Sequence, residues 1–365
     1  MGVKNLSKIF QKYCPQSIKR SNLDSYKGKT IGIDASIFFY RFMYVSNKYN
    51  KPNHYLQLFY QQIMGMIAKD ITPIYIFDGK PPAAKDNEKK KRSDAKISTR
   101  EKVNREKEYV EQLKKTLKGM SVNDEYRRLM YEIRTKEFKI KTKEDGIINV
   151  TEKHKSNLKA LLTILAIPFV QGYGETDPLS SQLCKDGLVD CILSDDMDYV
   201  PLACPSFIRT ERTPKGSGAD YERVILEYKH SDILQGLGMT SLQFIDLCIL
   251  CGCDYVDQLY KIGPITAFKL IKDHQSIENA LGYIDHIKHK VPGNYMELVK
   301  EARACFQKTH THRITKKMLN IKQPDIPKLK NFMKRFCDFS SKNQEYYLHV
   351  LFKSPIVPIK QDFFN

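Results

Sequence analysis

Four apolar stretches of this chain run into acidic residues. Each stretch is short and rich in β-branched or aromatic residues, and helical patterns separate them, which predicts buried parallel strands alternating with helices. With the acids that follow, the stretches are 30–34, 73–78, 167–177 and 191–198. Because the carboxyl ends of parallel strands meet at one edge of an α/β sheet, we expect the acids to converge there. The predicted fold class is α/β, with a mostly parallel central sheet flanked by helices.

These acids form a set with a definite chemistry. They are Asp34, Asp78, Glu175, Asp177, Asp196 and Asp198, and Asp254 follows a later apolar helix. Asp195 lies between two of them and should point away, since neighbours on an extended backbone face opposite sides. Clustered carboxylates repel one another unless cations are bound between them. Oxygen ligands suit Mg²⁺ or Mn²⁺, which bind phosphates, so the set indicates a metal-dependent phosphodiesterase acting on nucleic acid. A single such acid would more often be a helix cap or a turn residue.

Residues 80–150 break this pattern. They hold 21 Lys and Arg against 13 Asp and Glu, with many helix formers. We expect a disordered loop or a helical excursion that becomes ordered on nucleic acid, protease-sensitive at 85–135 without DNA because it is too polar to form a core. Lys85, Lys89, Arg92 and Lys96 share one helical stripe, which is either a solvated face or a phosphate-binding face next to Asp78.

Charge and composition narrow the class of partner. The chain of 365 residues has 60 Lys and Arg against 42 Asp and Glu, a net charge of +18. Such an excess favours a polyanion, although a charged surface that only confers solubility is the alternative. No stretch of about 18 apolar residues occurs, so we expect no membrane segment. The nine cysteines lack zinc-like spacing, and we expect free thiols.

Six motifs occur in one order along the chain. They are Met1–Leu6, Ile33–Ser36, Ile76–Pro82, Glu175–Asp177, Asp195–Asp198 and Leu247–Tyr255. In sequence and order they resemble the flap endonuclease family of structure-specific 5′ nucleases. The resemblance covers essentially the whole chain. It implies a PIN-like nuclease core with a helical arch and a helix–two-turn–helix element. The implied activity is structure-specific cleavage of 5′ flaps in branched DNA by two metal ions, in DNA replication and repair.

The resemblance also implies roles for individual residues. Asp34, Asp78, Glu175 and Asp177 form the first metal site, and Asp196, Asp198 and Asp254 form the second. Gly2, after removal of Met1, places its α-amino group near the metals, and Lys85 and Arg92 reach the scissile phosphate. DNA is contacted by Tyr40, Lys89, Lys96, Ile262, Gly263 and Pro264. The implied cofactors are two Mg²⁺, replaceable by Mn²⁺, and K⁺ at the helix–two-turn–helix.

The implied organisation divides the chain into five parts. They are a first core part at 1–80, a basic arch at 81–150, a second core part at 151–230, a duplex-binding region at 231–310 and a C-terminal tail at 311–365. The last forty or so residues show little order-promoting pattern. Phe363 and Phe364 could bind a sliding clamp, although the motif around them is degenerate and they could instead fold back onto the enzyme.

Three departures from the family pattern concern substrate grip. The chain has Glu175-Thr-Asp-Pro178 in place of Glu-Ala-Glu-Ala, Gln61 or Gln62 in place of an arginine, and Ile265-Thr266 in place of a basic pair. Two alternatives remain open: a 5′→3′ exonuclease of the same family and a catalytically silent DNA-binding scaffold. We expect a monomer, located in the nucleus or, for a protein of a large DNA virus, at a cytoplasmic replication site.

Overall fold

The computed structural model describes residues 2–3, 5–79, 86–214, 221–337, 339 and 341–358, without the side chains of 86–89 and 341. Four of the predicted functional side chains therefore lie outside the described residues. They are those of Lys85, Lys89, Phe363 and Phe364.

A seven-stranded sheet forms the centre of the molecule, in the order β1-β7-β6-β5-β2-β3-β4. Its strands are β1 (Ile18–Ser21), β2 (Thr30–Asp34), β3 (Thr72–Phe77), β4 (Phe169–Gln171), β5 (Cys191–Leu193), β6 (Ser206–Pro214) and β7 (Tyr221–Lys229). The pairs β2–β3, β2–β5, β3–β4 and β5–β6 are parallel, whereas β7 is antiparallel to both β1 and β6. The prediction of a mostly parallel α/β sheet is confirmed.

The central strands are buried on both faces. In β3, Ile74 and Ile76 pack into one apolar cluster, while Tyr75 and Phe77 pack into another on the opposite face. This alternation follows from the two-residue period of a strand. Two buried faces explain why the strands appear in the sequence as continuous apolar runs rather than as alternating ones.

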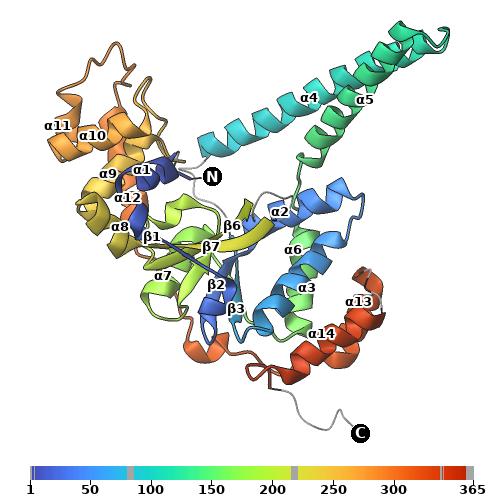
Figure 1. The fold of residues 1–365 in the computed structure, drawn as a ribbon. Helices are drawn as coiled ribbons and strands as arrows, with labels where there is room; N and C mark the ends of the chain where they lie inside the picture. The colour runs from blue at the N-terminus through green and yellow to red at the C-terminus, as the bar shows by residue number, and fades with distance from the viewer. Residues whose placement is uncertain are drawn as a thin grey trace.

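Helices cover both faces of the sheet (Figure 1). One face carries α2 (Ala35–Lys48), α3 (His54–Ile67), α6 (Glu152–Ile164), α13 (Ile326–Phe336) and α14 (Ser341–Lys353). The other carries α1 (Leu6–Tyr13), α7 (Thr176–Lys185), α8 (His230–Leu237), α9 (Ser241–Cys251), α10 (Pro264–His274), α11 (Ile277–Leu281) and α12 (Tyr295–Gln307). Short 3₁₀ helices are η1 (Pro15–Ser17), η2 (Leu23–Tyr26), η4 (Met197–Tyr199) and η5 (Lys316–Leu319).

The basic segment forms a helical hairpin that projects from the body (Figure 1). Its helices are α4 (Asp86–Leu117) and α5 (Asp124–Asp145). A small apolar cluster of its own joins them, formed by Val103, Val110, Leu117, Ile133 and Ile140. The expectation that this segment is too polar to form a core is therefore wrong. One apolar residue about every seven positions is enough to form a seam between two helices, even where the rest of each helix is charged.

The C-terminal part is also more ordered than its sequence suggested. Helices α13 and α14 pack against α3 and α6, and Leu329, Met333 and Leu351 are fully buried there. Most of the segment from 311 to 358 thus belongs to the core layer. Helix α13 alternates apolar and basic residues at helical spacing, which is the signal that the expectation of a tail overlooked.

Candidate metal-dependent nuclease site

Asp34 and Asp78 follow neighbouring parallel strands and share one hydrogen-bonding residue. Asp34 ends β2 and caps α2, where its Oδ1 accepts a bond of 3.0 Å from the Ser36 amide. The Ser194 hydroxyl donates to Oδ2 of Asp34 at 3.0 Å. Asp78 accepts hydrogen bonds from the Ser36 hydroxyl and, at 2.9 Å, from the Thr176 amide. The ends of β5, β2 and β3 and the start of α7 are thereby joined through these two carboxylates.

Asp34 shows the electrostatic state of this cluster. Burial, followed by the nearby charge of Asp78, raises the pKa of Asp34 to about 7. The carboxylate of Asp196 acts in the same direction. A bound divalent cation would reverse this, because it favours the ionised carboxylates. The oxygen-only donor set thus fits a hard cation such as Mg²⁺.

A second group of carboxylates adjoins the first. Asp177, Asp196 and Asp198 each offer a carboxylate oxygen, and these atoms all lie within 4.8 Å of one another. Asp196 caps η4, its Oδ1 accepting a bond of 3.1 Å from the Asp198 amide. The resemblance assigns Asp177 to the first metal site, but the structure places its carboxylate beside the acids of the second. Asp177 therefore lies with the second group of carboxylates in this structure.

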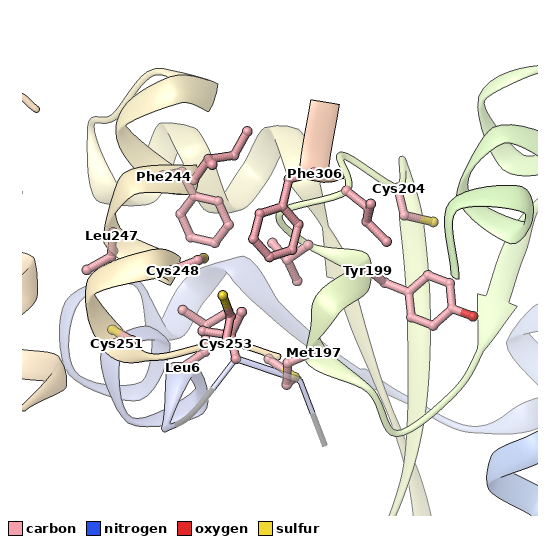
Figure 2. Packing of buried hydrophobic residues seen from close by; sticks show 14 of the residues in the cluster. Leu6, Met197, Tyr199, Cys204, Phe244, Leu247, Cys248, Cys251, Cys253 and Phe306 are labelled. Atoms are coloured by element: carbon pink, nitrogen blue, oxygen red, sulfur yellow. The ribbon is translucent and has the colours of Figure 1, made fainter. Parts of the chain in front are cut away.

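Asp195 faces away from this group, as predicted from the alternation along the chain. It forms an ion pair with Arg41 at 2.5 Å and lies 3.9 Å from Arg209. Met197, between the two ligands, is anchored in the apolar cluster beneath them. Figure 2 shows Met197, Cys253 and Leu6 within that same cluster. Buried neighbours thus fix the acids Asp196, Asp198 and Asp254 in position.

The N-terminal segment packs directly onto the acids. The Val3 amide donates a buried hydrogen bond of 2.8 Å to Oδ1 of Asp198. Gly2 has a φ of +76°, and a Cβ added there would overlap carboxylate oxygens of Asp196 and Asp198. Only glycine can therefore approach the acids so closely. This geometry agrees with the placement of Gly2 near the metals that the resemblance implies.

Glu175 and Asp254 complete the ring of seven acids. Glu175 caps α7 and accepts a bond of 3.5 Å from the Tyr255 hydroxyl. Asp254, which follows the end of α9, accepts a bond of 3.1 Å from Nη2 of Arg92 on α4. Arg92 thus lies at the acids, as the cation stripe predicted. The structure does not describe the side chains of Lys85 and Lys89 in the same stripe.

Two further predicted DNA contacts lie beside one another at the base of the hairpin. The Lys96 ammonium donates to the Ile148 carbonyl at 3.1 Å and lies 5.8 Å from the centroid of the Tyr40 ring. The Tyr40 side chain on α2 is 41% exposed, so one face remains available for stacking. Lys91, which the sequence did not single out, pairs with Asp257 at 2.6 Å.

The turn before α10 was expected to bind duplex through three residues. Gly263 caps α10, Pro264 begins it, and a Cβ on Gly263 would meet nothing within 4 Å, so the backbone there is open. The side chain of Ile262 is fully buried, and its carbonyl accepts from Gln258 at 2.6 Å. The prediction that Ile262 contacts DNA can therefore hold only for its backbone.

The sequence did not indicate a cation cluster next to this turn. The ammonium groups of Lys261 and Lys290 lie 5.1 and 4.8 Å from the centroid of the Tyr260 ring. Hydrogen bonds between Tyr260 and His289 join the two loops that carry these lysines. These lysines were not recognised because a basic pair was expected directly after the Gly-Pro turn. Lys261 instead precedes the turn, and Lys290 lies in a distant loop.

Among the described residues, no single helix is long and apolar enough to cross a membrane. Helices α8 and α9 reach the necessary length and hydropathy only when they are counted together, and the chain bends by 85° between them.

Comparison with known proteins gives a consistent family. Residues 1–99 match the XPG N-terminal domain and residues 166–254 match the XPG I-region. Flap endonuclease 1 of Ostreococcus lucimarinus is 31% identical over 342 residues, covering 91% of this chain and 80% of that protein. Flap endonuclease 1 of Entamoeba dispar is 35% identical over 319 residues, covering 84% and 75%.

Solved structures agree on the fold. Flap endonuclease-1 from Methanococcus jannaschii superimposes with a TM-score of 0.60 at 20% identity, covering 91% of this chain and 94% of that one. The catalytic core of Rad2 in complex with a DNA substrate gives 0.62 at 18% identity, covering 93% and 98%. Together with the sequence matches, the fold and the ring of acids show that the chain belongs to the flap endonuclease family and is a metal-dependent, structure-specific nuclease.

Proposed function

We propose that this chain cuts branched DNA at the base of a 5′ flap, leaving a 5′-phosphate and a 3′-hydroxyl. The observation that carries the proposal is the gathering of Asp177, Asp196 and Asp198 within 4.8 Å, with Asp34 and Asp78 close enough to influence one another's charge and Arg92 reaching Asp254 from the hairpin. Carboxylates without cations would repel a phosphodiester, so the ring suits DNA only when divalent ions are bound.

The proposed cofactor is a pair of Mg²⁺ ions, which Mn²⁺ can replace. Asp34, Asp78, Glu175 and Asp177 would hold one ion, and Asp196, Asp198 and Asp254 would hold the other. Asp177 lies close enough to Asp196 and Asp198 to contribute to the second ion as well. A pair of such ions supplies Lewis-acid stabilisation to both the attacking and the leaving oxygen of a phosphodiester. Ser36 and Ser194 orient the carboxylates by hydrogen bonds, and Met197 anchors the loop between two of them.

Residues on α4 supply the positive charge that the acids lack. The Arg92 guanidinium contacts Asp254 at 3.1 Å, so a small rotation of its exposed side chain suffices to reach a phosphate at the acids. Together with Lys85, it would stabilise the charge that develops on the phosphoryl oxygens. Tyr40, whose ring is partly exposed nearby, would stack on the nucleotide beside the cut.

The duplex would be held at the turn before α10. The backbone N–H groups of Gly263 and of Ile265 in the first turn of α10 would bind a phosphate, since Pro264 has none, and K⁺ would bind between that backbone and the DNA. The cluster of Tyr260, Lys261 and Lys290 supplies cations next to this turn. It would take the part of the basic pair that this chain replaces with Ile265-Thr266.

The decisive experiment is cleavage of end-labelled flap, nicked, bubble and four-way DNA with and without Mg²⁺. Single products from the base of the flap support the proposal. A ladder of short products from blunt or nicked ends would assign the chain to the exonuclease branch. DNA binding without cleavage in Mg²⁺ or Mn²⁺ would indicate that the chain is a catalytically silent DNA-binding scaffold.

The sliding clamp is a proposed partner through Phe363 and Phe364. A peptide of residues 351–365 titrated against the clamp from the same source tests it, with a Phe363→Ala/Phe364→Ala enzyme as the control for clamp stimulation. We also propose a monomer, measurable by light scattering. We further propose action at the nucleus or at a cytoplasmic viral replication site, which fluorescent tagging would distinguish.

A further inference from the structure

A cavity of about 770 Å³ lies along the free edge of β4, outside the ring of acids. Two segments far apart in sequence line it. One is β4 with the loop after it, 169–173, and the other is the segment 310–314, while Leu179 of α7 and Met318 and Leu319 of η5 complete the lining. Its volume falls within the range of about 300–1,000 Å³ that is typical of small-ligand pockets. It is thus large enough for a nucleotide-sized group.

The cavity adjoins the nuclease site directly. The Gln171 side chain, which lines the cavity, donates a hydrogen bond of 2.7 Å to the Asp78 carbonyl. The Gly79 amide donates to the Gly174 carbonyl at 2.7 Å, which holds the loop carrying Tyr173 against the end of β3. Glu175 follows Tyr173 by two residues. A strand leaving the acids on this side would therefore reach the cavity at once.

The chemistry of the lining suits an unpaired nucleotide. The Tyr173 side chain is 94% exposed, and Phe169 at 36% exposure presents a second aromatic surface. Among the residues that the structure describes, no carboxylate lies within 4.0 Å of the Arg313 guanidinium. Aromatic faces beside a cation are the usual arrangement for binding single-stranded nucleic acid, since every base can stack and every phosphate is an anion.

Two histidines support the same assignment. His312 pairs with Asp186 at 2.9 Å, which holds the segment 310–314 against the end of α7. Nδ1 of His310 is buried and, within the described part of the chain, has no hydrogen-bond partner. Both histidines line the cavity, so imidazole rings add polar groups to its wall beside the aromatic side chains.

We infer that this cavity binds an unpaired nucleotide of the displaced 5′ strand, with Tyr173 stacking on the base and Arg313 contacting a phosphate. The inference rests on the proposed function, because it assigns the cavity to the flap of the same substrate. It explains how the enzyme would prefer a flap to a nick. A nicked duplex has no unpaired nucleotide to place there, whereas a flap does.

The test compares two substrates that differ only in the flap. One is a nicked duplex and the other carries a flap of about ten nucleotides, long enough to span a single-strand site. Tyr173→Ala should weaken binding of the flapped DNA about tenfold, the scale of one lost stacking contact, and leave the nicked DNA unchanged. Tyr173→Phe should retain wild-type affinity, because the ring remains. Tyr346→Ala removes another exposed tyrosine, on α14, and should change binding of neither substrate.

Arg313 is tested by salt dependence. Arg313→Ala should lower the slope of log affinity against log salt by about one for the flapped DNA only. A 2-aminopurine base placed at successive flap positions should be quenched at one position, and Tyr173→Ala should abolish that quenching.

The outcomes separate this inference from the proposed function. If the wild-type enzyme cleaves flaps but Tyr173→Ala and Arg313→Ala act equally on both substrates, or on neither, the cavity does not bind the flap. If the wild-type enzyme fails to cleave any flap, the proposed function itself is wrong.

Discussion

The ring of acids and the helical hairpin place their charges in opposite ways. Each acid follows a buried strand or lies at an end of a helix, and residues next to several of them, such as Met197 and Cys253, pack in the main apolar cluster. The hairpin has a small apolar seam of its own, contacts α2 through α5, and reaches Asp254 and Asp257 through ion pairs at its base. The core therefore fixes the acids in position, whereas the cations lie on a projecting helical hairpin whose contacts with the body are polar.

This difference has an energetic consequence. The buried neighbours of the acids contribute roughly 1.5–3 kcal/mol each through apolar burial, so the acids hold their places even though they repel one another. The Arg92–Asp254 and Lys91–Asp257 pairs have partly exposed cations and are worth at most about 1 kcal/mol each. Arg92 can thus exchange Asp254 for a phosphate at little cost. The same freedom would be harmful in a metal ligand.

The strongest test of the fixed region compares two aspartates of the same loop, three positions apart. Asp198→Ala should abolish cleavage, because it removes a carboxylate from the group that we propose to hold the second metal ion. DNA binding should be retained or strengthened, since a negative charge is lost. Asp195→Ala should cut at close to the wild-type rate, because Asp195 faces Arg41 instead. Single-turnover cleavage and equilibrium binding of one flap substrate measure both. Comparable rates for the two variants would contradict the two-metal assignment.

The corresponding test of the helical hairpin compares two adjacent cations. Arg92→Ala should lower the single-turnover rate roughly 10²-fold, the scale of losing one electrostatic stabiliser, with little change in duplex affinity. Lys85→Ala should behave in the same way. Lys91→Ala removes a neighbouring cation that pairs with Asp257 and should have a much smaller effect. Equal losses of rate and affinity in Arg92→Ala would make it an ordinary phosphate-binding residue.

The contrast between the acids and the hairpin also explains which features could be predicted from the sequence. The acids were identifiable because each one ends an apolar run, so strand periodicity alone brings Asp34, Asp78 and Asp196 to one edge. The outward orientation of Asp195 followed from the two-residue period. The hairpin core was not foreseen, because its five apolar residues are spread over two helices among many charges.

Residues that act through long-range packing were also not predictable. The cavity beside β4 needs segments 169–173 and 310–314 to meet, and no local pattern encodes that contact. The role of Gln62 is similar. Its side chain accepts a hydrogen bond of 2.8 Å from the Tyr75 hydroxyl, which is a packing reason for glutamine at a position where an arginine was expected.

A third test asks whether the hairpin seam is a unit of its own. Ile140 is buried in the seam, whereas Phe138, two residues earlier, is 74% exposed. Ile140→Asn should open the hairpin, so that protease cuts within 86–145 and flap cleavage slows about tenfold as the cations lose their position. The melting temperature of the body should barely change, because the seam is separate from both main clusters. Phe138→Asn should leave digestion as in the wild type. Equal digestion of the two variants would mean that the seam does not hold the helices together.

The smallest expected effect concerns the electrostatic repulsion among the clustered acids, which makes the stability of the metal-free protein depend on pH. The folded pKa of Asp34 is raised to about 7, above its value of about 3.9 in an unfolded chain. Between these values the folded state binds more protons, so the metal-free protein should lose stability as pH rises from about 4 to 7. Mg²⁺ favours the ionised carboxylate and should therefore raise the melting temperature by a few degrees more at pH 8 than at pH 5. Calorimetry with Mg²⁺ or with a chelator measures this difference. Asp34→Asn, which cannot ionise, should reduce it. If Mg²⁺ raises the melting temperature of the wild-type protein equally at both pH values, the clustered acids do not have the unfavourable electrostatic energy that the raised pKa of Asp34 indicates.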